Sequence, residues 1–132
     1  MTQKDKDLLL KDLSSRLPYN PMVVYKGETY SVLGITHERL VLCKPFMSHI
    51  LDEFPLVKEV NPYLFPMSSM TEEQKTELND TLIQLELKAL NDEIEHHKVA
   101  EFEIDFYNKN MFDYRGLIEK GLANDATGLN IY

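Results

Sequence analysis

The chain has 132 residues, of which 43% are hydrophobic and 27% are charged, and its formal net charge is −8. This composition can supply one domain with its own core and is too apolar for intrinsic disorder along most of its length. Residues 71–132 hold fourteen acidic and six basic residues, whereas residues 1–70 are neutral, so the whole excess lies in the second half. An acidic balance argues against non-specific binding to nucleic-acid phosphates.

The sequence predicts no membrane-spanning or targeting segment and contains a single cysteine. No apolar run approaches the roughly 20 residues of a membrane-spanning helix, and the N-terminus is too polar for a signal peptide. The single cysteine, Cys43, lies in an apolar run, so we expect a small buried side chain there rather than a nucleophile. A chain without disulfides is typical of a reducing compartment, and we therefore expect a cytoplasmic protein.

Residues 4–16 are predicted to form the first helix. Leucines recur at spacings of three and four residues and make one apolar stripe, which Pro18 ends: Leu8, Leu9, Leu10, Leu13 and Leu17. The polar face mixes lysine with aspartate, unlike the basic face of a membrane-surface helix. We therefore expect this helix to pack on a sheet.

The pattern after the first helix is typical of strands. Gly27 suits a turn with positive φ, and Gly34 suits a β-bulge. Three segments are predicted to be strands: residues 22–25, 28–36 and 39–43. The connections between them are too short for crossovers, which predicts an antiparallel meander.

Prolines interrupt the segment that follows the meander. Residues 46–51 could form either a helical turn or a strand, and Pro55 breaks this segment. Residues 56–60 are predicted to form a short strand. Residues 61–66 contain two prolines, which favours an extended segment that packs its apolar side chains against the sheet.

Residues 71–98 are predicted to form one long helix. Thr71 and Gln74 make a capping-box pattern at its start. Apolar residues form two stripes, one at 78, 82, 85 and 89 and one at 83, 87, 90 and 94. One stripe is enough to dock a helix on a sheet. The second is therefore predicted to be a surface for another chain or for self-association: Ile83, Leu87, Leu90 and Ile94.

A continuous helix of about 27 residues would be about 40 Å long. A domain of this size has a radius of gyration of about 14 Å. We therefore expect that the helix breaks near Asn91 and Asp92, projects from the domain, or meets a partner.

The remaining residues are predicted to continue as helix to residue 122. Asp113 would cap a short last helix over 114–120, and Gly121 would end it. Residues 123–132 are predicted to form a loose tail. The whole chain is thus predicted to be one α+β domain with an N-terminal helix, a small antiparallel meander and a helical C-terminal half.

Motifs for chemistry are weak. The sequence has no phosphate-binding loop, dinucleotide fingerprint or HExxH motif, so no cofactor and no catalytic residue are predicted. His96 and His97 follow acidic residues by four positions, a spacing that suits two metal ligands, but a polar patch is favoured over a metal site. The alternation at residues 101–106 could also be an edge strand in place of the predicted helix, or a carboxylate site that nothing else in the sequence marks.

Asp113, Tyr114 and Arg115 form a compact motif that could be a binding site. A structural role is favoured, in which Asp113 caps a helix, Tyr114 packs and Arg115 forms a local ion pair.

Two segments also resemble an uncharacterised family of short proteins from gut Bacteroidales and their phages or mobile elements. They are residues 61–73, which include Ser68-Ser69-Met70-Thr71-Glu72-Glu73, and residues 112–122, which include Asp113-Tyr114-Arg115-Gly116-Leu117-Ile118-Glu119-Lys120-Gly121-Leu122. Leu17-Pro18-Tyr19 fits the same pattern. This family has no assigned activity, so the resemblance implies a phage or mobile-element setting and no catalytic residue.

The function that the sequence favours is therefore a non-enzymatic interaction or accessory protein with a protein partner. One alternative is a β-sheet module for nucleic acid, with phosphate contacts and stacking from Lys26, Arg39, Lys44, Lys58, Tyr25 and Tyr30. Another is an acidic mimic of nucleic acid.

Overall fold

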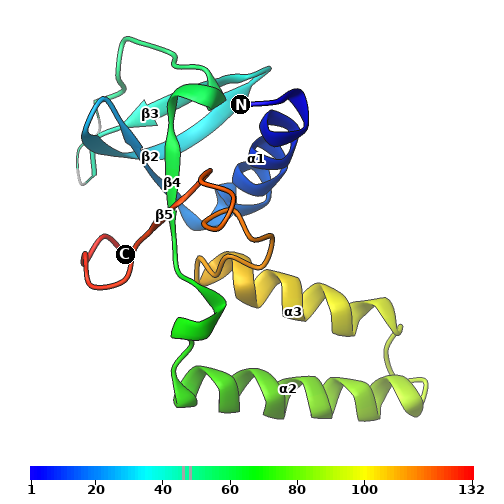
Figure 1. Cartoon of the computed structure of the whole chain (residues 1–132). Helices are drawn as coiled ribbons and strands as arrows, with labels where there is room; N and C mark the ends of the chain where they lie inside the picture. Colours follow the sequence, from blue (N-terminus) through cyan, green and yellow to red (C-terminus); the bar gives the residue numbers. More distant parts are fainter. Residues whose placement is uncertain (46, 48) are drawn as a thin grey trace.

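The computed structural model describes residues 1–45, 47 and 49–132, and its fold is α+β, as predicted. Three α-helices, three short 3₁₀ helices and a five-stranded sheet make up the regular structure of the described residues (Figure 1). The helices are α1 (Gln3–Arg16), α2 (Glu72–Leu90) and α3 (His97–Lys109), and the strands are β1 (Met22–Tyr25), β2 (Glu28–Thr36), β3 (Arg39–Cys43), β4 (Asn61–Leu64) and β5 (Asn124–Asp125).

The sheet has the strand order β3-β2-β1-β4-β5. Strands β1, β2 and β3 form the predicted antiparallel meander. Lys26 and Gly27 both have positive φ, 49° and 78°, so a two-residue turn of the kind that matches strand twist joins β1 to β2. The register between β2 and β3 shifts between Val32 and Gly34, which confirms the predicted bulge. Strand β4 pairs antiparallel with β1, and β5 pairs parallel with β4.

The segment between β3 and β4 differs in part from its prediction. The strand predicted at 56–60 is wrong, because Val57–Glu59 form a 3₁₀ helix that the Glu59 carboxylate stabilises by accepting from Leu56 N at 2.7 Å. The extended segment after it is confirmed as β4. The alternatives for 46–51 fall partly on residues 46 and 48, which lie outside the described residues.

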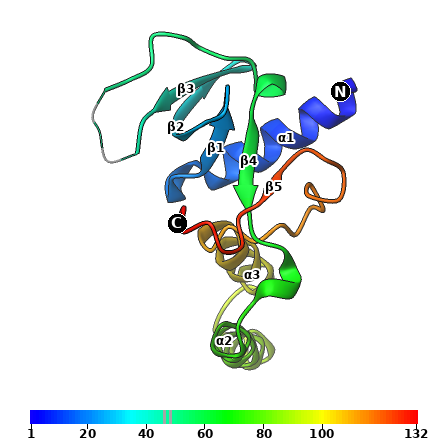
Figure 2. The ribbon, with the colours of Figure 1, turned by 60° about the vertical axis from the view of Figure 1, so that its left-hand side comes forward.

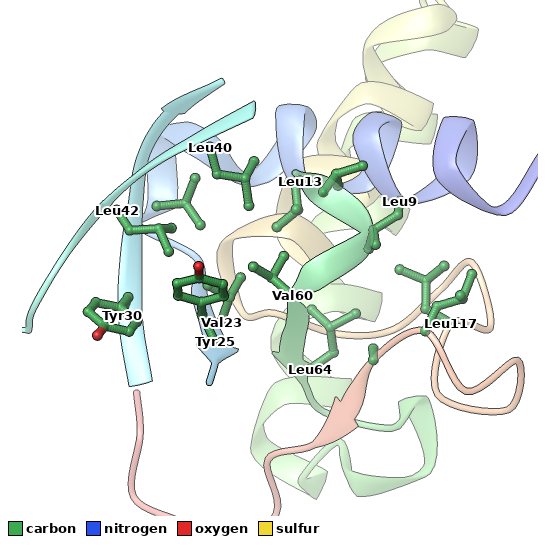
Figure 3. Close-up of a cluster of buried hydrophobic side chains, with 14 of the residues drawn as sticks. Leu9, Leu13, Val23, Tyr25, Tyr30, Leu40, Leu42, Val60, Leu64 and Leu117 are labelled. Carbon is green, nitrogen blue, oxygen red and sulfur yellow. The ribbon is translucent and has the colours of Figure 1, made fainter. Parts of the chain in front are cut away.

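Helix α1 packs on one face of the sheet and closes the main core (Figures 2 and 3). Leu9 and Leu13 on α1 are fully buried in one cluster to which side chains of all three meander strands also belong (Figure 3). Cys43 is 4% exposed, which confirms its predicted burial, and its thiol donates to Met47 O at 2.8 Å.

The C-terminal segment is ordered by the sheet, so the predicted loose tail is wrong. Asn124 and Asp125 form β5, and Ala126 N donates to Leu64 O at 2.9 Å. The Tyr132 hydroxyl accepts from Met22 N and donates to Tyr63 O, both at 2.8 Å. Burial of this hydroxyl end raises the pKa of Tyr132 to about 12, although 47% of the residue stays exposed.

The helix predicted over 114–120 does not form, and turns replace it. Gly116 adopts a left-handed φ of 74°, which no right-handed helix can include. Asp113 nevertheless caps this segment, because its two carboxylate oxygens accept from Leu117 N at 2.8 Å and Ile118 N at 2.9 Å.

Candidate interaction surface

Helices α2 and α3 form an antiparallel hairpin, residues 72–109, which we call the helical arm. Figures 1 and 2 show α3 between α2 and the rest of the fold, so α2 is the outermost element. Thr71 and Gln74 form the predicted capping box, with bonds of 3.1 and 2.9 Å. Helix α2 ends at Leu90, so among the alternatives left open for residues 71–98 the break near Asn91 and Asp92 is confirmed.

The break between the two helices lies at the predicted position and has a local cause. Asp92 adopts a left-handed conformation with φ 58°. Asp92 N donates to Ala89 O at 3.2 Å, and Glu93 N donates to Lys88 O at 2.9 Å. This is a Schellman-type helix end, in which aspartate stands where glycine is usual. The chain therefore turns back although no Gly or Pro marks the place.

The two apolar stripes of α2 have different environments. The stripe at 78, 82, 85 and 89 faces α3, where Leu78 joins Phe106 and Phe112 in a second small core. On the other stripe, Ile83 and Leu87 are each 55% exposed, and Leu90 is 74% exposed. We call these three residues the outer ridge. Ile94, the fourth residue predicted for this surface, is half-buried in the turn after α2.

Acidic side chains surround the outer ridge. The arm contains eleven acidic residues and four lysines, a net charge of −7 with neutral histidines. Exposed carboxylates lie beside the ridge at Asp80, Glu86, Asp92 and Glu93. Among the described residues, none of these four forms an ion pair, whereas Glu72 and Glu101 pair with lysines of the arm. The ridge is therefore an apolar line inside an uncompensated negative surface.

The base of the arm is joined to α1 through buried charges. Arg16, fully buried on α1, donates to both carboxylate oxygens of Asp12 at 3.0 Å, to Phe112 O at 2.7 Å and to Tyr107 O at 3.3 Å. Arg115 donates to Asp12 at 2.8 Å. The predicted local ion pair of Arg115 is therefore wrong, since its partner is 103 residues away.

Tyr114 completes this junction, which we call the buried clasp: Asp12, Arg16, Tyr114 and Arg115. Its ring centroid lies 5.4 Å from the Arg16 guanidinium and 4.4 Å from that of Arg115, and its hydroxyl donates to Asn108 at 3.0 Å. Among the described residues, no buried side-chain nitrogen or oxygen lacks a partner. The contacts of Asp113, Tyr114 and Arg115 are thus those of a structural junction.

The candidate metal and carboxylate residues are not assembled into a site. Asp92 and Glu93 lie in the turn, so they do not share a helix face with the histidines. In the part of the chain that the structure describes, no group of three or more His, Cys, Asp or Glu residues could hold a metal ion. Residues 101–106 lie in α3 and not in an edge strand. Burial and a 2.7 Å hydrogen bond to Glu103 raise the pKa of Tyr107 to about 12.

The sheet does not present the aromatic platform that a nucleic-acid module needs. Tyr25 and Tyr30 are only 7% and 5% exposed. Their hydroxyls donate to Glu53 and Glu28 at 2.7 and 2.8 Å. Lys26 and Lys44 form ion pairs with the same two carboxylates. The hydrogen bond from Tyr25 is the main cause that lowers the pKa of Glu53.

Sequence reasoning missed a groove of about 600 Å³ at the end of the β2–β3 hairpin. Its lining is mainly apolar, and Phe54 is 50% exposed there. Two chain segments contribute to it, residues 36–41 and residues 54–56. Only the return of the chain along β3 brings these segments together, so no local pattern could have revealed the groove.

Comparisons with family models, with curated proteins and with solved structures found no match to this chain. Within the described residues, no helix has the length and apolar character needed to cross a membrane.

Proposed function

We propose that the protein is a non-enzymatic interaction module whose outer ridge binds a protein partner. One observation carries this proposal: three large apolar side chains, Ile83, Leu87 and Leu90, are exposed in a row on a helix whose opposite face is already packed. Single exposed apolar residues are ordinary on protein surfaces, whereas a contiguous row at positions i, i+4 and i+7 is typical of helix-mediated recognition.

The arm is built to hold the ridge in place. The segments that enter and leave the arm are bonded to each other, since Phe65 N donates to Met111 O and Asp113 N donates to Phe65 O, both at 2.8 Å. The clasp adds the bonds from Arg16 to carbonyl groups at the base of the arm. A rigid ridge favours binding, because little conformational entropy is lost when a partner docks.

The resemblance to short proteins of Bacteroidales phages and mobile elements supports a setting for this function. In this proposal the protein is an accessory factor of such an element, and the partner is a protein of the element or of its host. A catalytic role has no support from the groups that the structure brings together.

Site-specific photocrosslinking tests the proposal. A photoreactive amino acid replaces Leu87 in one variant and Leu33, which is 50% exposed on β2, in a matched control. Expressed in the native host, the Leu87 variant should form a crosslink to one defined protein that the Leu33 variant does not form. The same crosslink from both positions, or none from Leu87, would contradict a partner at the ridge.

The acidic nucleic-acid mimic is a second candidate, because the arm holds seven of the eight net negative charges. Such a mimic would occupy a DNA-binding protein. In a competition assay without crosslinking, DNA should then prevent the partner that the crosslink identified from binding this protein. A partner that binds equally well with and without excess DNA would remove this candidate.

A further inference from the structure

We infer that the outer ridge binds a basic amphipathic helix of another protein, an inference that rests on the proposed interaction function. The shape of the ridge and the charges around it determine which partner chemistry fits.

The shape of the ridge suits a helix. From Ile83 to Leu90 the ridge extends about 10 Å along α2. Its three side chains project from consecutive turns, and such rows pack into the groove between the side-chain rows of a second helix. A partner helix with leucine-like residues at spacings of three and four would bury all three side chains.

The charges around the ridge select a basic partner. On the helical wheel, Asp80 lies on the same face as the ridge, one turn before Ile83, and Glu86 lies beside the ridge. Asp92 and Glu93 follow its C-terminal end. Since these carboxylates have no ion-pair partner among the described residues, cations of a docking helix can pair with them without breaking an existing contact.

The same charges disfavour a second copy of this chain. Two ridges packed face to face would bring together two arms, each with a net charge of −7. Lys88 is the one Lys or Arg among residues 80–94, whereas four carboxylates lie in this range. Like-charge juxtaposition at an interface suppresses the wrong pairing.

The test uses two designed peptides of about 18 residues, long enough to cover the ridge. One contains leucines at helical spacing with lysines elsewhere, and the other has glutamate at every lysine position. Fluorescence anisotropy with the full-length protein should show binding of the lysine peptide, and the glutamate peptide should bind at least about tenfold more weakly. Raising the salt concentration from about 50 to about 500 mM should weaken lysine-peptide binding by about tenfold.

Variants separate the contribution of the ridge from that of the charge. Ile83→Gln with Leu87→Gln removes apolar surface at constant charge, and should weaken binding by about tenfold or more. Asp80→Asn with Glu86→Gln removes charge beside an intact ridge, and should weaken binding several-fold and reduce its salt dependence. The control Asp52→Asn with Glu119→Gln removes the same charge from exposed positions outside the arm and should leave affinity unchanged.

The outcomes distinguish the two proposals. If the ridge variant binds the lysine peptide as well as the wild type does, binding is not at the ridge, and this test contradicts the proposed function. If the ridge variant loses binding but the two peptides bind equally, the ridge is a docking site and the inferred basic partner is wrong. The absence of binding by either peptide, or a dimer in light scattering that the ridge variant abolishes, also overturns the basic partner.

Discussion

The sheet with α1 and the helical arm bury their apolar side chains in different ways. In the first region, α1 covers one face of a sheet, and residues such as Leu13, Val23 and Leu40 are completely or almost completely enclosed (Figure 3). In the arm, α2 packs mainly against α3, and its buried residues are Leu78 and Ala89. We therefore expect that most of the stabilising apolar burial lies around α1, while the arm exposes apolar side chains that are not buried on folding.

The strongest effect is expected at the clasp, where the two regions meet. Asp12→Ala would leave the fully buried guanidinium of Arg16 and the partly buried one of Arg115 without their carboxylate, so we expect a loss of about 3–5 kcal/mol of unfolding free energy. Urea denaturation measures this loss. Asp7→Ala, at an exposed position of the same helix, is the control and should cost less than about 0.5 kcal/mol. Equal effects of the two substitutions would show that the clasp does not connect the regions.

The next prediction compares the two cores directly. Leu13→Ala should destabilise the protein by about 3 kcal/mol and increase hydrogen exchange throughout, because Leu13 is fully enclosed in the main core. Leu78→Ala should cost about 2 kcal/mol and increase exchange mainly in α2 and α3, since the second core connects few other elements. Hydrogen exchange monitored by mass spectrometry distinguishes the two patterns. Uniform exchange in the Leu78 variant would mean that arm and sheet unfold as one unit.

A smaller effect is expected at the C-terminal contact with the sheet. Tyr132→Phe removes the acceptor for Met22 N and the donor to Tyr63 O, and should cost about 1 kcal/mol. The pKa of Tyr132 is raised from 10.0 to about 12 in the folded protein. Its contribution is therefore complete below the unfolded value and is lost as pH rises through the folded value.

Urea denaturation between pH 9 and pH 12, at about one-unit steps, measures this dependence. The difference in stability between wild type and Tyr132→Phe should be constant up to about pH 10 and should shrink toward pH 12. A difference that stays the same over this range would contradict the buried, neutral hydroxyl.

The smallest effect on stability is expected at the outer ridge. Ile83→Gln with Leu87→Gln should change the free energy of unfolding by less than about 0.5 kcal/mol, because both side chains are 55% exposed. Thermal and urea denaturation measure this change. A loss comparable with that of Leu78→Ala would show that the ridge packs within the chain and is not a free surface.

The sequence predicted the elements that local pattern controls. The leucine spacing of α1, the alternation in the meander and the capping box of α2 all appear in the structure as expected. The two stripes of α2 were also predicted, because the 3.6-residue period of a helix fixes which side chains share a face, and this period can be read from the sequence. That a partner binds the outer stripe stays a prediction.

Other features depended on contacts between distant residues. The break near Asn91 and Asp92 was one of three expected alternatives, and only the packing of α2 on α3 in the folded chain decided among them. The predicted loose tail was wrong because short polar and small residues become a strand only when β4 offers them a free edge.

By itself, the sequence determined the α+β class, the helix and meander at its start, and the negative charge of the second half, since propensity, periodicity and charge are local properties. Only the tertiary structure decided which stripe of α2 is enclosed, that Arg115 pairs with Asp12, and that the acidic residues surround an exposed apolar ridge. These features depend on the chain reversal at Asp92 and on which segments it brings into contact. Such contacts form between residues that are distant in the sequence, so no single segment specifies them.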